Sequence, residues 1–265
     1  AALLEQMPRL DLAGIKDELA ARETRLPIRR VLPVNLPEHL RHDSADVVYQ
    51  DLSWMRNVAI YPYDYKTHPL LAFADQFEFK IDCVVDPVHS SAHGKDAGVV
   101  YSQEPLGVPV LANLDEIPTE TDTLIVGNTD ALQIGLREDV LLRILTWSVE
   151  KSKNVFSFCP VEPHIYCNLH KSAREKNLIW YSPSNFLNAI WNTNTQELEQ
   201  DIDVPVIGVF GTSYNQGKLT TLLALRRWLC KEGYEVGVVG TNPIYALLKN
   251  GVCVVQDKRI PQYIS

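Results

Sequence analysis

The chain has 265 residues, 46% of them apolar and 22% charged, with five cysteines and a formal net charge of −8. This composition is that of a globular protein and excludes a disordered chain, and the length is typical of two domains. The acidic balance argues against nucleic acid as a partner. Because no apolar run approaches the roughly 20 residues of a membrane span, we expect no membrane association. Scattered, odd-numbered cysteines are typical of a reducing compartment, so we expect a cytoplasmic protein.

Residues 1–56 show no clear domain pattern. Pro27, Pro33 and Pro37 predict an irregular, extended passage, because proline fixes the backbone and removes a hydrogen-bond donor. We interpret this segment as an N-terminal arm that packs on the body or on a neighbouring subunit. From it we expect a homo-oligomer.

Residues 57–185 alternate short apolar runs with helical stretches, which predicts a Rossmann-like α/β domain. Strands that are apolar throughout belong to a parallel sheet covered on both faces. The runs predict strands at 58–61, 79–86, 108–112, 123–127, 154–158 and 179–182, and helices at 68–74, 139–151 and 163–176.

The loops after these strands are expected at the ligand edge of the sheet, because ligands bind at the carboxyl ends of parallel strands. The first loop, YPYDYKT (residues 61–67), lacks the glycines of a dinucleotide-binding turn. Asp86 follows the second strand, where an acidic residue holds a ribose in such folds, but a turn-capping role is the commoner one. We therefore do not predict NAD binding.

Candidate catalytic residues lie in the same loops. His89 and His93 lie in the second loop, residues 87–98, and histidine is the usual proton carrier near neutral pH. Unengaged surface histidines are an equally good interpretation. Asp64, beside Lys66, is a weaker candidate for binding a small acid.

The spacing C-x₄-H-x₂-C-x₂-H suggests a zinc site. It comprises Cys159, His164, Cys167 and His170. The spacing fits no standard zinc finger, so a buried cysteine with ordinary surface histidines is the better interpretation, and we predict no metal site.

Residues 186–202 are polar and predict a linker, followed by a P-loop NTPase-like α/β domain at 203–265. Residues 204–210 (VPVIGVF) predict a buried strand, and a glycine-bounded loop then leads into a helix at 219–231. Strand, glycine loop, lysine and helix in this order predict a phosphate-binding loop. The unpaired amides of the first helical turn and the charge of Lys218 would hold the anion.

The loop departs from the common pattern in two ways. Five residues, rather than four, separate Gly211 from Gly217, and Leu219 stands where a Mg²⁺-binding hydroxyl is usual. The longer gap resembles that of dethiobiotin-synthetase-like proteins. The predicted cofactor-binding residues are Gly211, Thr212, Asn215, Gln216, Gly217, Lys218, Leu219, Thr220 and Thr221.

Beyond the loop, Gly233 predicts the end of the helix, and strands are expected at 235–240 and 252–255. A complete P-loop domain needs several further strands, including an acidic one for Mg²⁺ and water. We therefore expect a C-terminally truncated domain.

The order of these pieces resembles a two-domain family, formerly a domain of unknown function, that includes D-glutamate N-acetyltransferases. Residues 211–221 (GTSYNQGKLTT) are similar to its GTD-x-x-x-GK-x-TT motif. Residues 236–248, 84–98 and 108–117 also resemble family segments. Ser213 replaces the motif's Asp, and residues 241–245 lack the family's glycines. The resemblance implies a Rossmann-like domain followed by a P-loop domain, with acetyl-CoA as cofactor.

Two functional classes remain open at this point. In the first, an N-acetyltransferase acts on a small amino acid such as D-glutamate, with acetyl-CoA on the P-loop. In the second, the loop binds ATP, with Mg²⁺, in a ligase-like enzyme or a nucleotide-responsive assembly protein without catalysis. A non-catalytic relative is a third reading.

Overall fold

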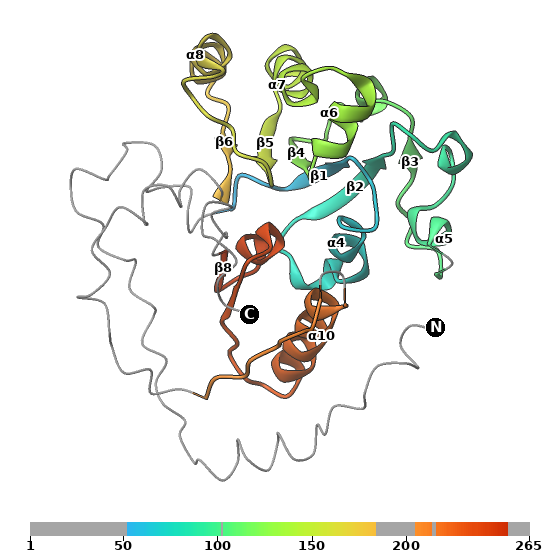
Figure 1. The fold of residues 1–265 in the computed structure, drawn as a ribbon, viewed down its shortest axis with the longest axis vertical. Coiled ribbons are helices and arrows are strands. Elements are labelled where there is room, and N and C mark those ends of the chain that lie inside the picture. The colour runs from blue at the N-terminus through green and yellow to red at the C-terminus, as the bar shows by residue number, and fades with distance from the viewer. Residues whose placement is uncertain (1–51, 102, 184–204, 214–215, 254–265) are drawn as a thin grey trace, which may run out of the picture.

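The computed structural model describes residues 52–101, 103–183, 205–213 and 216–253 (Figure 1). The predicted N-terminal arm before residue 52, the linker at 186–202 and Asn215 of the P-loop lie outside the described residues.

A six-stranded parallel sheet forms the centre of the molecule. Its strands follow the order β3-β2-β1-β4-β5-β6, and every neighbouring pair is parallel. This is the classic doubly wound order, in which the chain reverses direction across the sheet between β1 and β4. The predicted Rossmann-like α/β fold is therefore confirmed. The strands are β1 (Asn57–Tyr61), β2 (Lys80–Val85), β3 (Val110–Leu111), β4 (Thr123–Val126), β5 (Asn154–Ser157) and β6 (Trp180–Tyr181).

The strands are apolar throughout because both faces of the sheet are covered. All four residues of β4 are buried. In β1, Val58 and Ile60 belong to one hydrophobic cluster, and Ala59 and Tyr61 belong to another on the opposite face. Successive side chains of a strand point to opposite faces, so each strand contributes to both clusters.

Three helices lie together on one side of the sheet in Figure 1: α6 (Asp130–Leu136), α7 (Val140–Lys151) and α8 (Cys167–Glu175). Helix α7 supplies most of the helical side chains of the cluster on this face. It begins where predicted, with the Asp139 carboxylate accepting the Leu142 N–H at 2.9 Å. The predicted 163–176 helix is shorter than expected. Helix α6 falls within a stretch interpreted only as a loop, and none of its side chains is buried.

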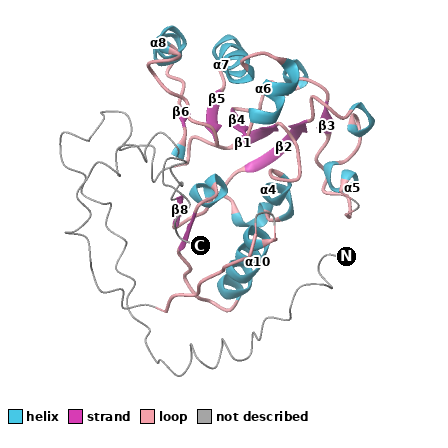
Figure 2. Ribbon diagram, viewed as in Figure 1, coloured by secondary structure: helices cyan, strands magenta, loops and turns pink. Residues whose placement is uncertain are grey.

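The other face is covered by helices from both ends of the described chain. The crossovers there supply only short helices, α4 (His68–Ala72) and α5 (Ala97–Val100). The remaining cover comes from α10 (Lys218–Lys231) and the 3₁₀ helix η6 (Pro243–Leu247), which lie below the sheet in Figures 1 and 2. Leu223 and Ile244 are fully buried in the same cluster as Val58 and Phe156 of the sheet.

Polar contacts tie α10 to the end of α4 and the following 3₁₀ helix η2 (Ala74–Gln76). Gln76 donates its amide to the Leu223 carbonyl at 2.9 Å and accepts from Arg226 at 2.9 Å. Arg227 donates to the Ala72 carbonyl at 2.9 Å and also pairs with Asp75. The helix that follows the P-loop is therefore held to the Rossmann-like sheet by both apolar and polar contacts.

The C-terminal part contains a second, two-stranded parallel sheet of β7 (Val238–Gly240) and β8 (Gly251–Cys253). Both strands were predicted, as was the helix end at Gly233, which has φ +90° while the Tyr234 N–H bonds back to the Leu229 carbonyl at 3.1 Å.

The predicted buried strand at 204–210 is wrong for its described part, residues 205–210. These residues form no strand, and Val206 and Phe210 are 74% and 92% exposed. An apolar run becomes a strand only beside a partner. Neither β7 nor β8 pairs with this one.

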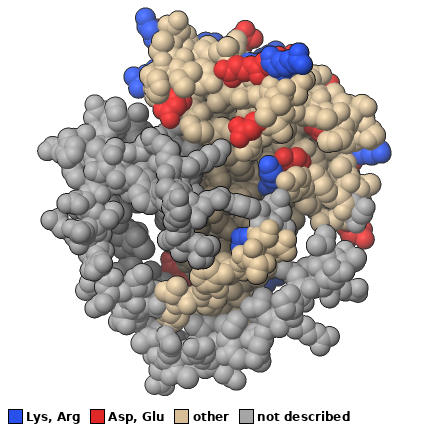
Figure 3. Space-filling view, viewed as in Figure 1, with Lys and Arg blue, Asp and Glu red and all other residues tan. Residues whose placement is uncertain are grey.

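Among the described residues, no helix has the length and apolar character needed to cross a membrane. On the face in Figure 3, acidic and basic side chains of the described residues are interspersed rather than gathered by sign.

We predict that Leu223→Ala destabilises the sheet as well as α10. Truncating a buried leucine typically costs about 2–5 kcal/mol. We expect one cooperative urea transition, shifted to lower concentration in both fluorescence and circular dichroism. The exposed neighbour offers a control, Ala224→Ser, which should change the free energy of unfolding by no more than about 0.5 kcal/mol. A loss confined to a separate, earlier transition would contradict a shared core.

Candidate functional site

The lysine of the predicted P-loop folds back over the loop. Its Nζ donates to the Ser213 carbonyl at 2.6 Å. A Cβ placed on Gly211 would lie 3.0 Å from Lys218 Cδ and 3.2 Å from Nζ. A side chain at position 211 would therefore require the lysine side chain to shift by a few tenths of an ångström. The described part of the predicted loop thus has Lys218 close to its backbone at Gly211 and Ser213.

The start of α10 is open toward this loop. Gly217 is the N-cap residue, with φ +78°, a conformation that favours glycine. It makes no side-chain cap, and the first backbone bond of the helix runs from the Thr221 N–H to the Gly217 carbonyl at 2.8 Å. The preceding amides of the first turn have no acceptor within the helix. Together with Lys218, they supply partial and full positive charge at one place.

The residue after the lysine faces the core. Leu219 packs against the hydrophobic cluster beneath the sheet, so this position offers no hydroxyl to a metal ion. Thr220 and Thr221 follow it and are half-buried. Thr212, Ser213 and Gln216 are exposed.

At the carboxyl edge of the sheet, the turn at residues 64–67 after β1 is held by hydrogen bonds among its own residues. One carboxylate oxygen of Asp64 accepts the N–H groups of Lys66 and Thr67 at 2.9 and 3.0 Å. A Cβ on Gly127, after β4, would lie 2.7 Å from the Thr67 methyl group. Asp64 therefore caps a turn, and the Thr67 side chain packs closely against Gly127, the residue that follows β4.

The second loop brings a carboxylate and two histidines together. Asp86 is buried, and its carboxylate accepts the N–H groups of Val88 and His89 at 2.9 Å. The same carboxylate lies 3.0 Å from His89 Nδ1, while the imidazole remains largely exposed. His93 is held differently, with Nε2 2.8 Å from the Asp86 carbonyl. Of the two predicted histidines, His89 is the one with a carboxylate behind it.

Asp96 of the same loop has a structural role. It accepts from four backbone N–H groups, those of Gly98, Leu106, Gly107 and Val108. Desolvation works to raise the pKa of Asp96, and these donors outweigh it, so that the pKa lies below its usual value.

A buried aromatic group behind this loop was not foreseen from the sequence. Tyr63 donates to the Ala97 carbonyl and lies 2.8 Å from His68 Nδ1, and the rings of His68 and Tyr101 are 4.5 Å apart. Desolvation lowers the pKa of His68 and raises that of Tyr101 to about 12. Both are therefore uncharged near neutral pH. No local sequence pattern marks this group, because Tyr63 and Ala97 are 34 positions apart.

The four residues with zinc-like spacing have separate partners. Cys159 lies 3.6 Å from the Gly127 carbonyl, His164 lies 3.8 Å from Glu162, and the His170 ring packs edge-on against Trp180. Cys167 is exposed. Within the described ranges, no three His, Cys, Asp or Glu side chains gather in a way that could hold a metal ion.

The sequence of residues 190–265 matches a family model described as a domain of unknown function (DUF1611_C), P-loop domain. The match contains the loop and helix described above and supports the P-loop interpretation directly. No curated protein matches the chain.

Solved structures resemble the chain over about half its length. They include an NAD-binding protein from Listeria innocua (12% identity, TM-score 0.37, 48% of this chain and 35% of that one). A 3-ketoreductase from Actinomadura kijaniata in complex with TDP-benzene and NADP is another, with 13% identity and a TM-score of 0.36 over 48% of this chain and 38% of that one. Amine dehydrogenase from Mycobacterium smegmatis has 16% identity and a TM-score of 0.35 over 46% of this chain and 37% of that one. The chain thus spans little more than a third of the length of these structures, and likenesses this weak say nothing about ligand or activity.

Proposed function

We propose that Gly211–Thr221 binds the phosphate groups of a nucleotide-type cofactor. The observation that carries this proposal is the position of Lys218, folded over Gly211 beside the uncapped start of α10. A lysine and a first helical turn directed at one place form an anion-binding arrangement. The P-loop family match over residues 190–265 supports it. The cofactor-binding residues named from the sequence, including the undescribed Asn215, remain part of this proposal.

Acetyl-CoA is the cofactor we favour. Phosphoryl transfer from ATP needs Mg²⁺, and in common P-loops a hydroxyl after the lysine holds it. Here that position is Leu219, which packs into the core. The phosphates of acetyl-CoA need positive charge and amides but no metal. The resemblance of residues 211–221 to D-glutamate N-acetyltransferases points the same way.

In this function, a small amino acid such as D-glutamate would be the acceptor and His89 the base. The buried Asp86 carboxylate orients His89 through Nδ1 and leaves Nε2 directed away from it. His89 Nε2 would take a proton from the substrate ammonium, freeing the amine. The amine nitrogen attacks the thioester carbonyl, the C–N bond forms, and the C–S bond breaks. CoA leaves as a thiolate, which the proton released from nitrogen neutralises. His93 and Asp64, already engaged with backbone groups, are weaker candidates.

ATP is the alternative, and the threonines favour it. Thr220 and Thr221 put hydroxyls within the first turn of α10, one and two residues later than usual. With ATP on the loop, the protein would be a ligase-like enzyme or a nucleotide-responsive assembly protein. In either case we propose that residues 57–185 form the Rossmann-like unit and residues 203–265 the P-loop unit packed against it. We also propose a cytoplasmic location and assembly as a homo-oligomer.

We expect acetyl-CoA to raise the melting temperature and Lys218→Ala to abolish the shift. A ligand at 100 times its Kd adds about 2.7 kcal/mol to the free energy of unfolding. Calorimetric unfolding should be followed with acetyl-CoA, ATP·Mg²⁺ and NAD in parallel, using Lys171→Ala on the exposed face of α8 as the matched control. A melting shift with ATP·Mg²⁺ alone would contradict the acyltransferase proposal and support the ATP-binding alternative. A shift that survives Lys218→Ala, or none with any ligand, would refute the P-loop site.

We expect His89→Gln to abolish acetyl transfer while leaving the acetyl-CoA-induced melting shift intact. Loss of a positioned base typically lowers turnover by about 10²–10⁴-fold. Release of free CoA thiol with D-glutamate and other small amino acids measures the rate. His93→Gln is the comparison, and we expect it to retain most of the activity. Unchanged turnover in His89→Gln would rule out its role as base.

A further inference from the structure

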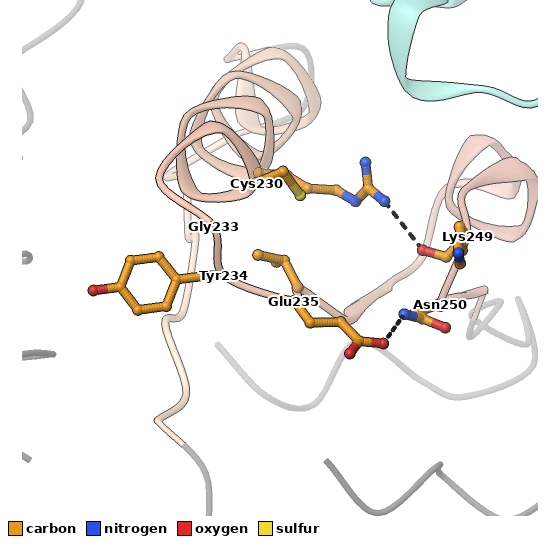
Figure 4. Close-up of a pocket in the computed structure, with 8 residues that line it drawn as sticks. Cys230, Gly233, Tyr234, Glu235, Lys249 and Asn250 are labelled. Atoms are coloured by element: carbon orange, nitrogen blue, oxygen red, sulfur yellow. Dashed lines mark hydrogen bonds between the residues drawn. The ribbon is translucent and has the colours of Figure 1, made fainter. Parts of the chain in front are cut away.

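A groove with several charged side chains in its lining runs along the last turns of α10, at the end of the helix away from the P-loop. It consists of two adjoining hollows of about 350 and 410 Å³. Both are lined by Arg226, Cys230 and Lys249, and Figure 4 shows the smaller one between the end of α10 and the turn before β8. The distance from Lys218 to Arg226 along the helix axis is about 12 Å at the usual rise per residue.

Arg226 is the unusual member of this groove. It shares the face of α10 that carries Leu219, Leu223 and Leu229, so a cation occupies a position in an otherwise apolar stripe. It is only 9% exposed. A buried arginine is normally paired with a carboxylate or phosphate, because an unpaired buried charge is costly.

The described partners of Arg226 are neutral. It donates to the Gln76 side-chain carbonyl at 2.9 Å and to the Lys249 backbone carbonyl at 3.1 Å. Its Nε–H is buried and finds no acceptor among the described residues. None of the ion pairs in the described part of the chain includes it. Two bonds use fewer than half of the donors of a guanidinium group.

The charged side chains that line the groove include more cations than acids. Among the acids of the groove, Asp75 is paired with Arg227. Glu235 accepts from the Asn250 amide at 3.0 Å, an interaction that Figure 4 marks with a dashed line. Glu78 lines the larger hollow. Lys231 and Lys249 add positive charge at the rim, and both are exposed.

We propose that this groove binds a small oxyanion, a phosphate or carboxylate group, anchored by Arg226 and assisted by Lys231 and Lys249. The planar guanidinium group suits either oxyanion, because two of its N–H groups can meet two oxygens. Binding would neutralise the buried charge where α10 meets η2 and β8. The site is separate from the P-loop, and its ligand need not be the cofactor.

The test measures melting temperature against inorganic phosphate and, separately, succinate, at constant ionic strength set with chloride. Because phosphate would also bind the P-loop, Lys218→Ala is the background for every variant. We expect phosphate or succinate to raise the melting temperature of Lys218→Ala, and Arg226→Met to weaken the apparent affinity about tenfold, as expected for loss of charged hydrogen bonds. A response to one oxyanion only identifies which group the groove takes.

A second variant, altered only at exposed lysines, tests the proposal even if Arg226→Met fails to fold. Lys231→Ala with Lys249→Ala removes two rim charges and keeps the Lys249 carbonyl that Arg226 uses, and we expect about threefold weaker binding. Lys171→Ala, on α8, should bind as the background protein does. No melting shift in the Lys218→Ala background, or equal shifts with and without the groove cations, would overturn the proposal.

Discussion

A parallel sheet of apolar strands is stable only when both of its faces are covered, and here one cover depends on α10. Helix α7 and its neighbours cover one face, but the crossovers on the other supply only the short α4 and α5. The uncovered part of that face is filled by Leu223 of α10 and Ile244 of η6. Helix α10 and the sheet therefore share a hydrophobic core, although residues 182–217 separate β6 from α10 in the sequence.

This packing gives α10 two different ends. Its first turn, with Gly217 and Lys218, has no side-chain cap, and its face and last turns are fixed by leucines, Arg226 and Arg227. A binding helix anchored along its length keeps its first amides in place, which lowers the ordering cost of binding. The same anchoring leaves Arg226 buried, with no ion pair to any acid of the described residues. The cofactor proposal and the oxyanion proposal thus arise from opposite ends of one helix.

Much of this architecture was predictable from the sequence, because it depends on local patterns. Continuous apolar runs located the six strands of the main sheet, and the Gly217-Lys218 step located the start of α10. The failed strand at 205–210 shows the limit, since an apolar run fixes neither a partner nor burial. The capping role of Asp64 and the pairing of Asp86 with His89 were not predictable either, because they depend on how each loop folds back on itself.

The contacts between α10 and the rest of the protein were the features least predictable from the sequence. Gln76 and Arg226 are 150 positions apart and meet only because α10 packs below α4. Periodicity identifies the apolar stripe of a helix but not the surface against which it docks. An arginine in that stripe was the one available signal, and a charge on a core-facing position is reason to look for a specific partner.

Native-state hydrogen exchange tests most directly whether α10 is part of the sheet's core. The amides around Leu223 should exchange through the same global opening as those of β4, with equal free energies and equal dependence on denaturant. Exchange of α10 through a local opening, several kcal/mol lower and insensitive to denaturant while β4 stays protected, would contradict this account.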